Sequence, residues 1–197
     1  MNTSPKRILT TGVACLALAI LIQPSGTLAA DDRHAPDRSL KELMPLEQVE
    51  QWTSPPVDLD QVFAEDEANR GRTDIPYRIG FPMETDLSPA NSGSWEVLPN
   101  GDSVWRLKVR SEGAIWIVLG FETFKIQPGG AMTVYDPARK TVKGPYTSAD
   151  IRRHGELWFP PIEGDTLVVE LSWPAALQAE QPNIHLTTVS HLSLIHI

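Results

Sequence analysis

The sequence predicts an all-β fold, an antiparallel β-sandwich of jelly-roll-like type, preceded by a signal peptide and an acidic, partly helical lead segment. Three observations predict it. From residue 75 onward, short apolar runs recur between turn signals at even spacing. Residues 103–110 alternate between apolar and polar side chains, as a half-buried strand does. No stretch after residue 75 has helical periodicity of useful length, and about eight or nine short strands favour two packed sheets.

Residues 1–29 have the pattern of a secretory signal peptide. Lys6 and Arg7 precede an apolar stretch at residues 8–22, and small residues lead to an expected cleavage site after Ala29 or Ala30. The stretch is shorter than the roughly 20 apolar residues of a comfortable membrane span. We therefore expect a secreted or periplasmic protein with no stable membrane anchor after cleavage.

Residues 30–74 form the acidic lead segment. It holds twelve acidic and five basic residues, and prolines interrupt its sparse apolar positions. A short helix is predicted near residues 59–69, capped by Asp58 and ended by Gly71. Three of its apolar residues share one face at spacings of three and four, namely Leu59, Val62 and Phe63.

Residues 75–191 carry the predicted strands. We expect them at residues 77–81, 94–98, 103–110, 114–124, 132–135, 142–145, 157–159, 166–173 and 183–189. The Pro-Asn-Gly-Asp sequence at 99–102 predicts a tight turn, and residues 136–140 a hairpin loop. Residues 103–110 should place their basic side chains, including Arg106, on a solvated outer face. Residues 114–124 are nearly all apolar, which predicts a strand that is buried on both faces or runs through the centre of a sheet.

Charge and cysteine content exclude several classes of function. The net charge is −8, and it becomes −10 once Lys6 and Arg7 leave with the signal. An acidic exported chain without a basic patch is a poor ligand for nucleic acid, because phosphate neutralisation requires Lys and Arg. Cys15, the single cysteine, lies in the signal peptide. The exported part therefore has no disulfide, no thiol chemistry and no cysteine-bound metal, and we expect no cofactor.

Two sets of residues have the composition of a serine-hydrolase site. Ser148, Asp150 and His154 supply the three residue types of a catalytic triad, and residues 101–103 read Gly-Asp-Ser. Nothing nearby indicates a strained nucleophile turn or an oxyanion donor, and Val104 and Trp105 stand where glycines would follow. We interpret the first set as a polar loop and the second as a hairpin turn, and predict no catalytic residue.

Metal and sugar sites are the remaining possibilities. Four histidines outside the last six residues lie singly, without the spacing of metal ligands: His34, His154, His185 and His191. The turn at residues 163–165 offers two carboxylates, whereas calcium takes six to eight oxygen ligands. The six tryptophans leave sugar binding open. Alternation places Trp105 and Trp173 in the core, while Trp95, Trp116 and Trp158 are not assigned; a sugar-binding face needs several exposed indoles in a row.

An ordered series of segments resembles the pro-region of secreted bacterial trypsin-like and lysyl-endopeptidase-like serine proteases. These segments are residues 92–111, 113–124, 128–137, 144–148, 156–158 and 164–171, with 58–68 similar to that family's lead helix and 189–191 to its junction with the protease. The resemblance implies a precursor of signal peptide, pro-domain and chymotrypsin-like protease domain. It stops where the protease should begin, so no catalytic residue of the family can be placed here, and we expect no peptidase activity from this chain itself.

The resemblance also implies a function and a partner. We expect a non-catalytic pro-domain that aids folding of, or inhibits, the protease domain downstream in the same precursor. One alternative is a secreted binding module for carbohydrate or cell-surface polymer, and another is an accessory domain retained beside the mature enzyme. Arg152 and Arg153 could form a processing site, although a solvated loop pair is the interpretation we prefer.

The last six residues, Leu192, Ser193, Leu194, Ile195, His196 and Ile197, resemble the translation of a sequencing-library adaptor. We expect the natural chain to continue beyond about His191. Resequencing the gene from source DNA past the codon for His191 tests this expectation. A natural stop codon after Ile197 would contradict it.

Overall fold

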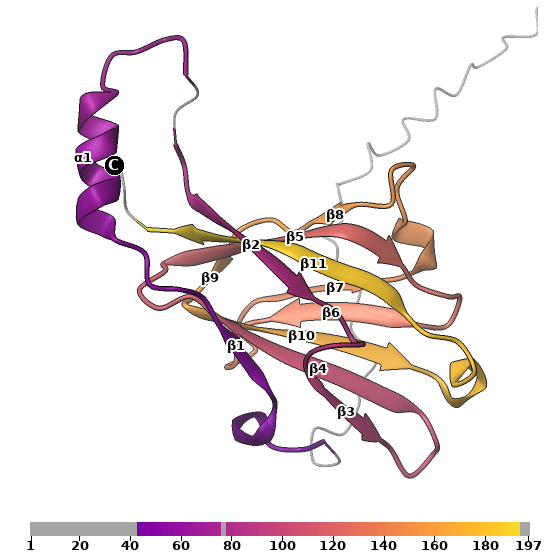
Figure 1. Cartoon of the computed structure of the whole chain (residues 1–197). Helices are drawn as coiled ribbons and strands as arrows, with labels where there is room; N and C mark the ends of the chain where they lie inside the picture. Colours follow the sequence, from indigo (N-terminus) through magenta and orange to yellow (C-terminus); the bar gives the residue numbers. More distant parts are fainter. Residues whose placement is uncertain (1–42, 76–77, 194–197) are drawn as a thin grey trace, which may run out of the picture. The chain divides into compact units, whose positions relative to one another are not determined.

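The computed structural model describes residues 43–75 and 78–193 (Figure 1). The predicted signal peptide and its expected cleavage site after Ala29 or Ala30, together with His34 and Tyr77, lie outside the described residues. The strands are β1 (Gln51–Thr53), β2 (Phe81–Leu87), β3 (Ser94–Val97), β4 (Ser103–Arg110), β5 (Trp116–Lys125), β6 (Ala131–Tyr135), β7 (Val142–Tyr146), β8 (Leu157–Trp158), β9 (Ile162–Glu163), β10 (Thr166–Trp173) and β11 (Asn183–Leu192). The helix α1 spans Leu59–Ala68, and 3-10 turns occupy Leu46–Gln48, Ser148–Asp150 and Ala175–Leu177.

One sheet has six strands in the order β1-β4-β10-β6-β7, with β3 beside β1 on the same edge of β4. Its centre is the antiparallel pair β4–β10, in which Leu107 lies opposite Val169. The predicted turn at residues 99–102 joins β3 to β4, and the predicted loop at 136–140 joins β6 to β7. Both hairpin predictions are confirmed.

The second sheet has five strands in the order β2-β11-β5-β8, with β9 also pairing with β5. Strand β11 is central, because it pairs with β2 on one side and with β5 on the other. The two short strands share the far edge of β5, where Trp158 of β8 lies opposite Gly120 and Glu163 of β9 lies opposite Trp116. All pairs in this sheet are antiparallel.

The two sheets stack on a shared core and neither closes into a barrel within the described ranges (Figure 1). The six-stranded sheet contributes residues such as Trp105, Leu107 and Leu171, and the five-stranded sheet contributes Ile117 and Val189, all 0–2% exposed. Burial of each such side chain stabilises the fold by about 1.5–3 kcal/mol. The predicted β-sandwich is confirmed, with the parallel pair β1–β4 as its one mixed feature.

The lead segment also follows the prediction in part. Asp58 caps α1 by accepting a hydrogen bond from the backbone N–H of Gln61, which satisfies a free donor of the first turn. Val62 is buried, whereas Phe63 on the same predicted face is 41% exposed. The sequence did not indicate β1, which extends the six-stranded sheet from within this segment. No helix in the described ranges is long and apolar enough to cross a membrane.

One strand prediction needs correction. The strand expected at residues 77–81 begins only at Phe81 and runs to Leu87. Pro82 disfavours a strand in the interior of a sheet, but β2 is an edge strand, where a proline costs no ladder hydrogen bond.

Strand β5 follows the second of its two expected arrangements. It runs through the interior of its sheet, with β11 on one side and β8 and β9 on the other. It is not buried on both faces, because inward residues such as Ile117 are buried, whereas Trp116 and Val118 on the other face are partly exposed.

The solvated face expected for β4 is wrong at Arg106, whose side chain is 3% exposed. Its guanidinium contacts the carboxylate of Glu96, with Nε donating to Oε1 at 3.1 Å, and also donates to the backbone carbonyl of Met44. The backbone N–H of Met44 donates to the other oxygen of Glu96. The lead segment thus covers this part of the six-stranded sheet and satisfies a buried charge.

Candidate functional site

The two serine-containing sets occupy structural positions. Asp150 accepts hydrogen bonds from the N–H and hydroxyl of Thr147, forming a capping box around the 3-10 turn that holds Ser148. Asp102 accepts from the N–H of Ala175 at 2.9 Å, and Gly101 adopts φ +86° in the turn before β4. These bonds support the interpretation of both sets as turns.

A serine–histidine pair that the sequence did not indicate lies elsewhere. Ser111 Oγ is 2.9 Å from Nδ1 of His191, and Ser54 Oγ donates to Ser111 Oγ at 3.1 Å. Such a pair has the spacing of a nucleophile and its base. Ser111 and His191 are only 0% and 1% exposed, so no substrate reaches them. We therefore interpret the pair as a structural hydrogen bond that joins the residue after β4 to the end of β11.

The candidate metal ligands are dispersed. His185 pairs with Asp86 at 2.7 Å, while His191 is buried and His154 is exposed. In the turn at residues 163–165, the Asp165 carboxylate accepts from Thr166 Oγ1 at 2.8 Å. No group of three or more His, Cys, Asp or Glu side chains among residues 43–75 and 78–193 could hold a metal ion. Arg152 and Arg153 are both exposed, which agrees with the preferred interpretation as a solvated loop pair, and the alternative of a processing site is not tested.

The tryptophans divide between core and surface. Trp105 and Trp173 are 2% exposed, which confirms their core assignment, whereas Trp95 and Trp158 are 38% and 56% exposed. The two exposed indoles belong to different sheets, Trp95 to β3 and Trp158 to β8. No row of fully exposed indoles therefore lies on one face of the part described.

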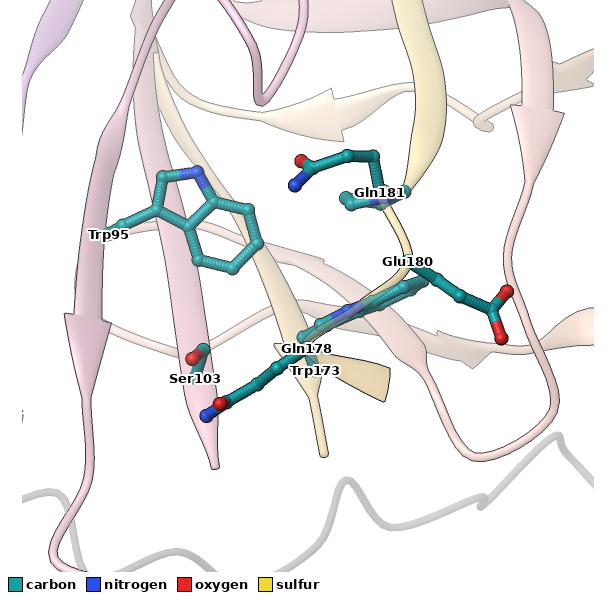
Figure 2. Close-up of a pocket in the computed structure, with 7 residues that line it drawn as sticks. Trp95, Ser103, Trp173, Gln178, Glu180 and Gln181 are labelled. Carbon is teal, nitrogen blue, oxygen red and sulfur yellow. The ribbon is translucent and has the colours of Figure 1, made fainter. Parts of the chain in front are cut away.

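A shallow hollow of about 280 Å³ lies beside Trp95 (Figure 2). The indole is fixed because its Nε1 donates to the Pro89 carbonyl at 3.0 Å. The carboxamide of Gln181 points toward this ring, whereas the carboxylate of Glu180 points away from it (Figure 2). Gln178 is anchored by its own amide, which donates to the Gly101 carbonyl at 2.7 Å. An aromatic edge and neutral amides can contact a ligand that combines apolar and hydroxyl surface.

The second exposed indole lies on the outer face of the five-stranded sheet. Inward residues of β5 and β11 alternate with outward ones, and Trp158 of β8 lies on the outward side beside Gly120. The central outward residues are Trp116, Val118, Gly120, Trp158, Ser190 and Leu192. We call this set the Trp158 face. A Cβ on Gly120 would lie 2.5 Å from the Trp158 ring, which shows that the indole lies directly against the backbone of β5.

The fold is thus a two-sheet domain whose chain leaves from a central strand, without a catalytic constellation among the sets that the sequence indicated. A family model described as the lysyl endopeptidase N-terminal domain matches residues 53–193. The chain belongs to this family, and it holds the N-terminal region of a lysyl-endopeptidase-like precursor. The resemblance stated from the sequence is confirmed.

Proposed function

We propose that this domain is the non-catalytic pro-domain of an exported serine endopeptidase precursor, which aids the folding of a downstream protease domain or inhibits it. One observation supports this most directly. The family match begins in β1, at Thr53, and ends at Ser193, directly after β11. The matched unit therefore contains α1 and all strands from β2 to β11, which is nearly the whole sandwich.

Export is part of the proposal. The apolar N-terminal stretch and the small residues before Ala29 and Ala30 support cleavage of a signal peptide, followed by release to the periplasm or medium. In this proposal the protease domain folds slowly, because its strands pair residues that are far apart in the chain. A pro-domain that is already folded would lower the free-energy barrier to folding of the protease domain.

The experiment uses the catalytic domain encoded beyond the codon for His191. This domain is unfolded, then refolded alone or with the exported chain, and its activity is followed on a chromogenic lysyl peptide. We expect the chain to raise the refolding yield or to inhibit the folded enzyme. An unchanged yield together with an uninhibited enzyme would exclude both roles. A natural stop codon after Ile197 would also contradict the proposal.

The hollow beside Trp95 favours a second candidate, a carbohydrate-binding module. Sugar rings stack on exposed indoles, and the neutral amide of Gln181 suits hydroxyl groups (Figure 2). A pull-down on insoluble polysaccharides tests this candidate. We expect Trp95→Ala to abolish retention and Phe63→Ala, which removes an exposed ring on α1, to leave it unchanged. Equal retention of both variants would remove the hollow from consideration.

A further inference from the structure

We propose that the Trp158 face is the surface on which the downstream protease domain docks, with an apolar centre and an acidic rim; this inference rests on the proposed function. The first argument is exposure. Trp158 is 56% exposed, although it lies at the middle of a sheet edge and not on a loop tip. Large exposed aromatic residues of this kind are typical anchors of protein interfaces.

The second argument is the shape of the face. The strand register places Trp158 beside Gly120, and the absence of a side chain there lets the indole lie against the strand. Val118 of β5 lies opposite Ser190 of β11, and Trp116 lies opposite Leu192. The centre of the face is consequently low and largely apolar, as the buried centre of an interface requires.

The third argument is where the chain leaves the sandwich. Strand β11 supplies Ser190 and Leu192 to the Trp158 face, and the last described residue, Ser193, follows immediately. Leu192 also packs toward Gly80, since a Cβ on that glycine would lie 2.9 Å from Leu192 Cδ1. A domain that begins shortly after Ser193 is held next to this face by its own linkage, at a high effective concentration.

The fourth argument is charge. Three exposed carboxylates surround the face, Glu84 on β2, Glu122 on β5 and Glu163 on β9. These three carboxylates outnumber the exposed cation of β5, Lys125. Residues 75–197 as a whole hold 13 acidic and 10 basic residues, so the acidic character is local to the face. The partner surface is accordingly expected to be apolar at its centre and basic at its rim, which fixes orientation and raises the rate of encounter.

The six-stranded sheet offers no comparable surface in the described ranges. The lead segment covers the part of its outer face around Arg106, with Met44 bonded to both Glu96 and Arg106. The hollow between Met44 and Arg139 is lined by charges that are already paired, because Arg106 contacts Glu96 and Arg139 contacts Glu170 at 3.0 Å. On the Trp158 face, by contrast, Trp158 is 56% exposed, and Trp116, Val118 and Leu192 are partly exposed in the part of the chain that the structure describes.

The test uses the complete precursor encoded by the gene, with the yield of active protease as its readout. Trp158→Ala combined with Val118→Ser should lower the yield about tenfold or more, as loss of an interface anchor does. The matched control is Val97→Ser with Val142→Ser, which removes two exposed apolar side chains from the other sheet and should change the yield less than about twofold. A third precursor lacks residues 43–193.

The Trp158→Ala, Val118→Ser variant could lower the yield simply because the pro-domain misfolds, so a second variant is tested by direct binding. Glu84→Lys with Glu163→Lys changes only exposed side chains, and it should weaken binding of the exported chain to the refolded protease, with a smaller salt dependence than wild type. If deletion of the domain leaves the yield unchanged and the separately added exported chain does not inhibit the protease, the proposed function itself fails.

If deletion abolishes the yield while the Trp158 face variants match wild type, the proposed function stands and the docking face is overturned. Two other results would also overturn the docking face. The first is a dimer of the exported chain whose molar mass halves in the Trp158→Ala variant. The second is binding to polysaccharide that this variant loses while its protease yield is unchanged.

Discussion

Ser111 and His191 share a hydrogen bond of 2.9 Å in the core, although 80 residues separate them in the chain. Ser54 Oγ donates to Ser111 Oγ at 3.1 Å, so the three side chains form one chain of hydrogen bonds. Nε2 of His191 has no hydrogen-bond partner among the described residues. A second proton on this imidazole would therefore place a charge with an unpartnered nitrogen in the core.

The first prediction follows from this burial, which lowers the pKa of His191 below its ordinary value of 6.5. As the pH falls below about 6.5, the unfolded chain binds a proton at this residue before the folded one does. The free energy of unfolding should therefore decrease on acidification, from pH 6.5 down to the folded-state pKa. Urea unfolding at several pH values, compared between wild type and His191→Gln, measures this contribution.

The control for this comparison is His154→Gln, because His154 is exposed. We expect His154→Gln to retain the full acid sensitivity and His191→Gln to lose part of it. Equal pH dependence in His191→Gln and wild type would show that the buried imidazole does not titrate below its ordinary range.

The second prediction concerns the buried pair of Arg106 and Glu96. Glu96→Gln leaves the guanidinium in a site where its side chain is 3% exposed, and should cost about 3–5 kcal/mol of unfolding free energy. Replacing both residues, as Arg106→Met with Glu96→Met, should recover part of that loss because no charge stays buried. Denaturant titration of Glu96→Met, Arg106→Met and the double variant, beside Glu96→Gln, measures the coupling.

The exposed pair of Arg70 and Glu67 provides the reference, since both side chains are more than 60% exposed. Glu67→Gln should leave the midpoint of unfolding unchanged within error. If Glu96→Gln behaves in the same way, Arg106 is reached by water and the lead segment does not seal this site.

The sequence predicted those parts of the fold that depend on neighbouring residues. The boundaries of β4 and β10 follow from alternation, and α1 from its cap at Asp58. The burial of Arg106 could not be predicted, because it depends on a carbonyl 62 residues away in the lead segment. Register alone decides that Trp158 faces outward beside Gly120. The candidate docking face is in this sense a property of strand pairing, which a single sequence does not reveal.

The last prediction compares two glycines with the same backbone conformation, Gly93 and Gly113, each at φ +78°. A Cβ on Gly113 would meet nothing within 4 Å, whereas one on Gly93 would lie 2.3 Å from Nε1 of Trp105 and 2.8 Å from the carbonyl of Arg106. The left-handed conformation penalises alanine equally at both sites. Trp105 cannot retreat, because it is 2% exposed and its Nε1 donates to the Ser92 carbonyl at 2.7 Å. Gly93→Ala should therefore lower the unfolding free energy by at least about 2 kcal/mol more than Gly113→Ala. Parallel denaturant titrations measure the difference, and equal losses would show that the turn before β3 yields to make room for a methyl group.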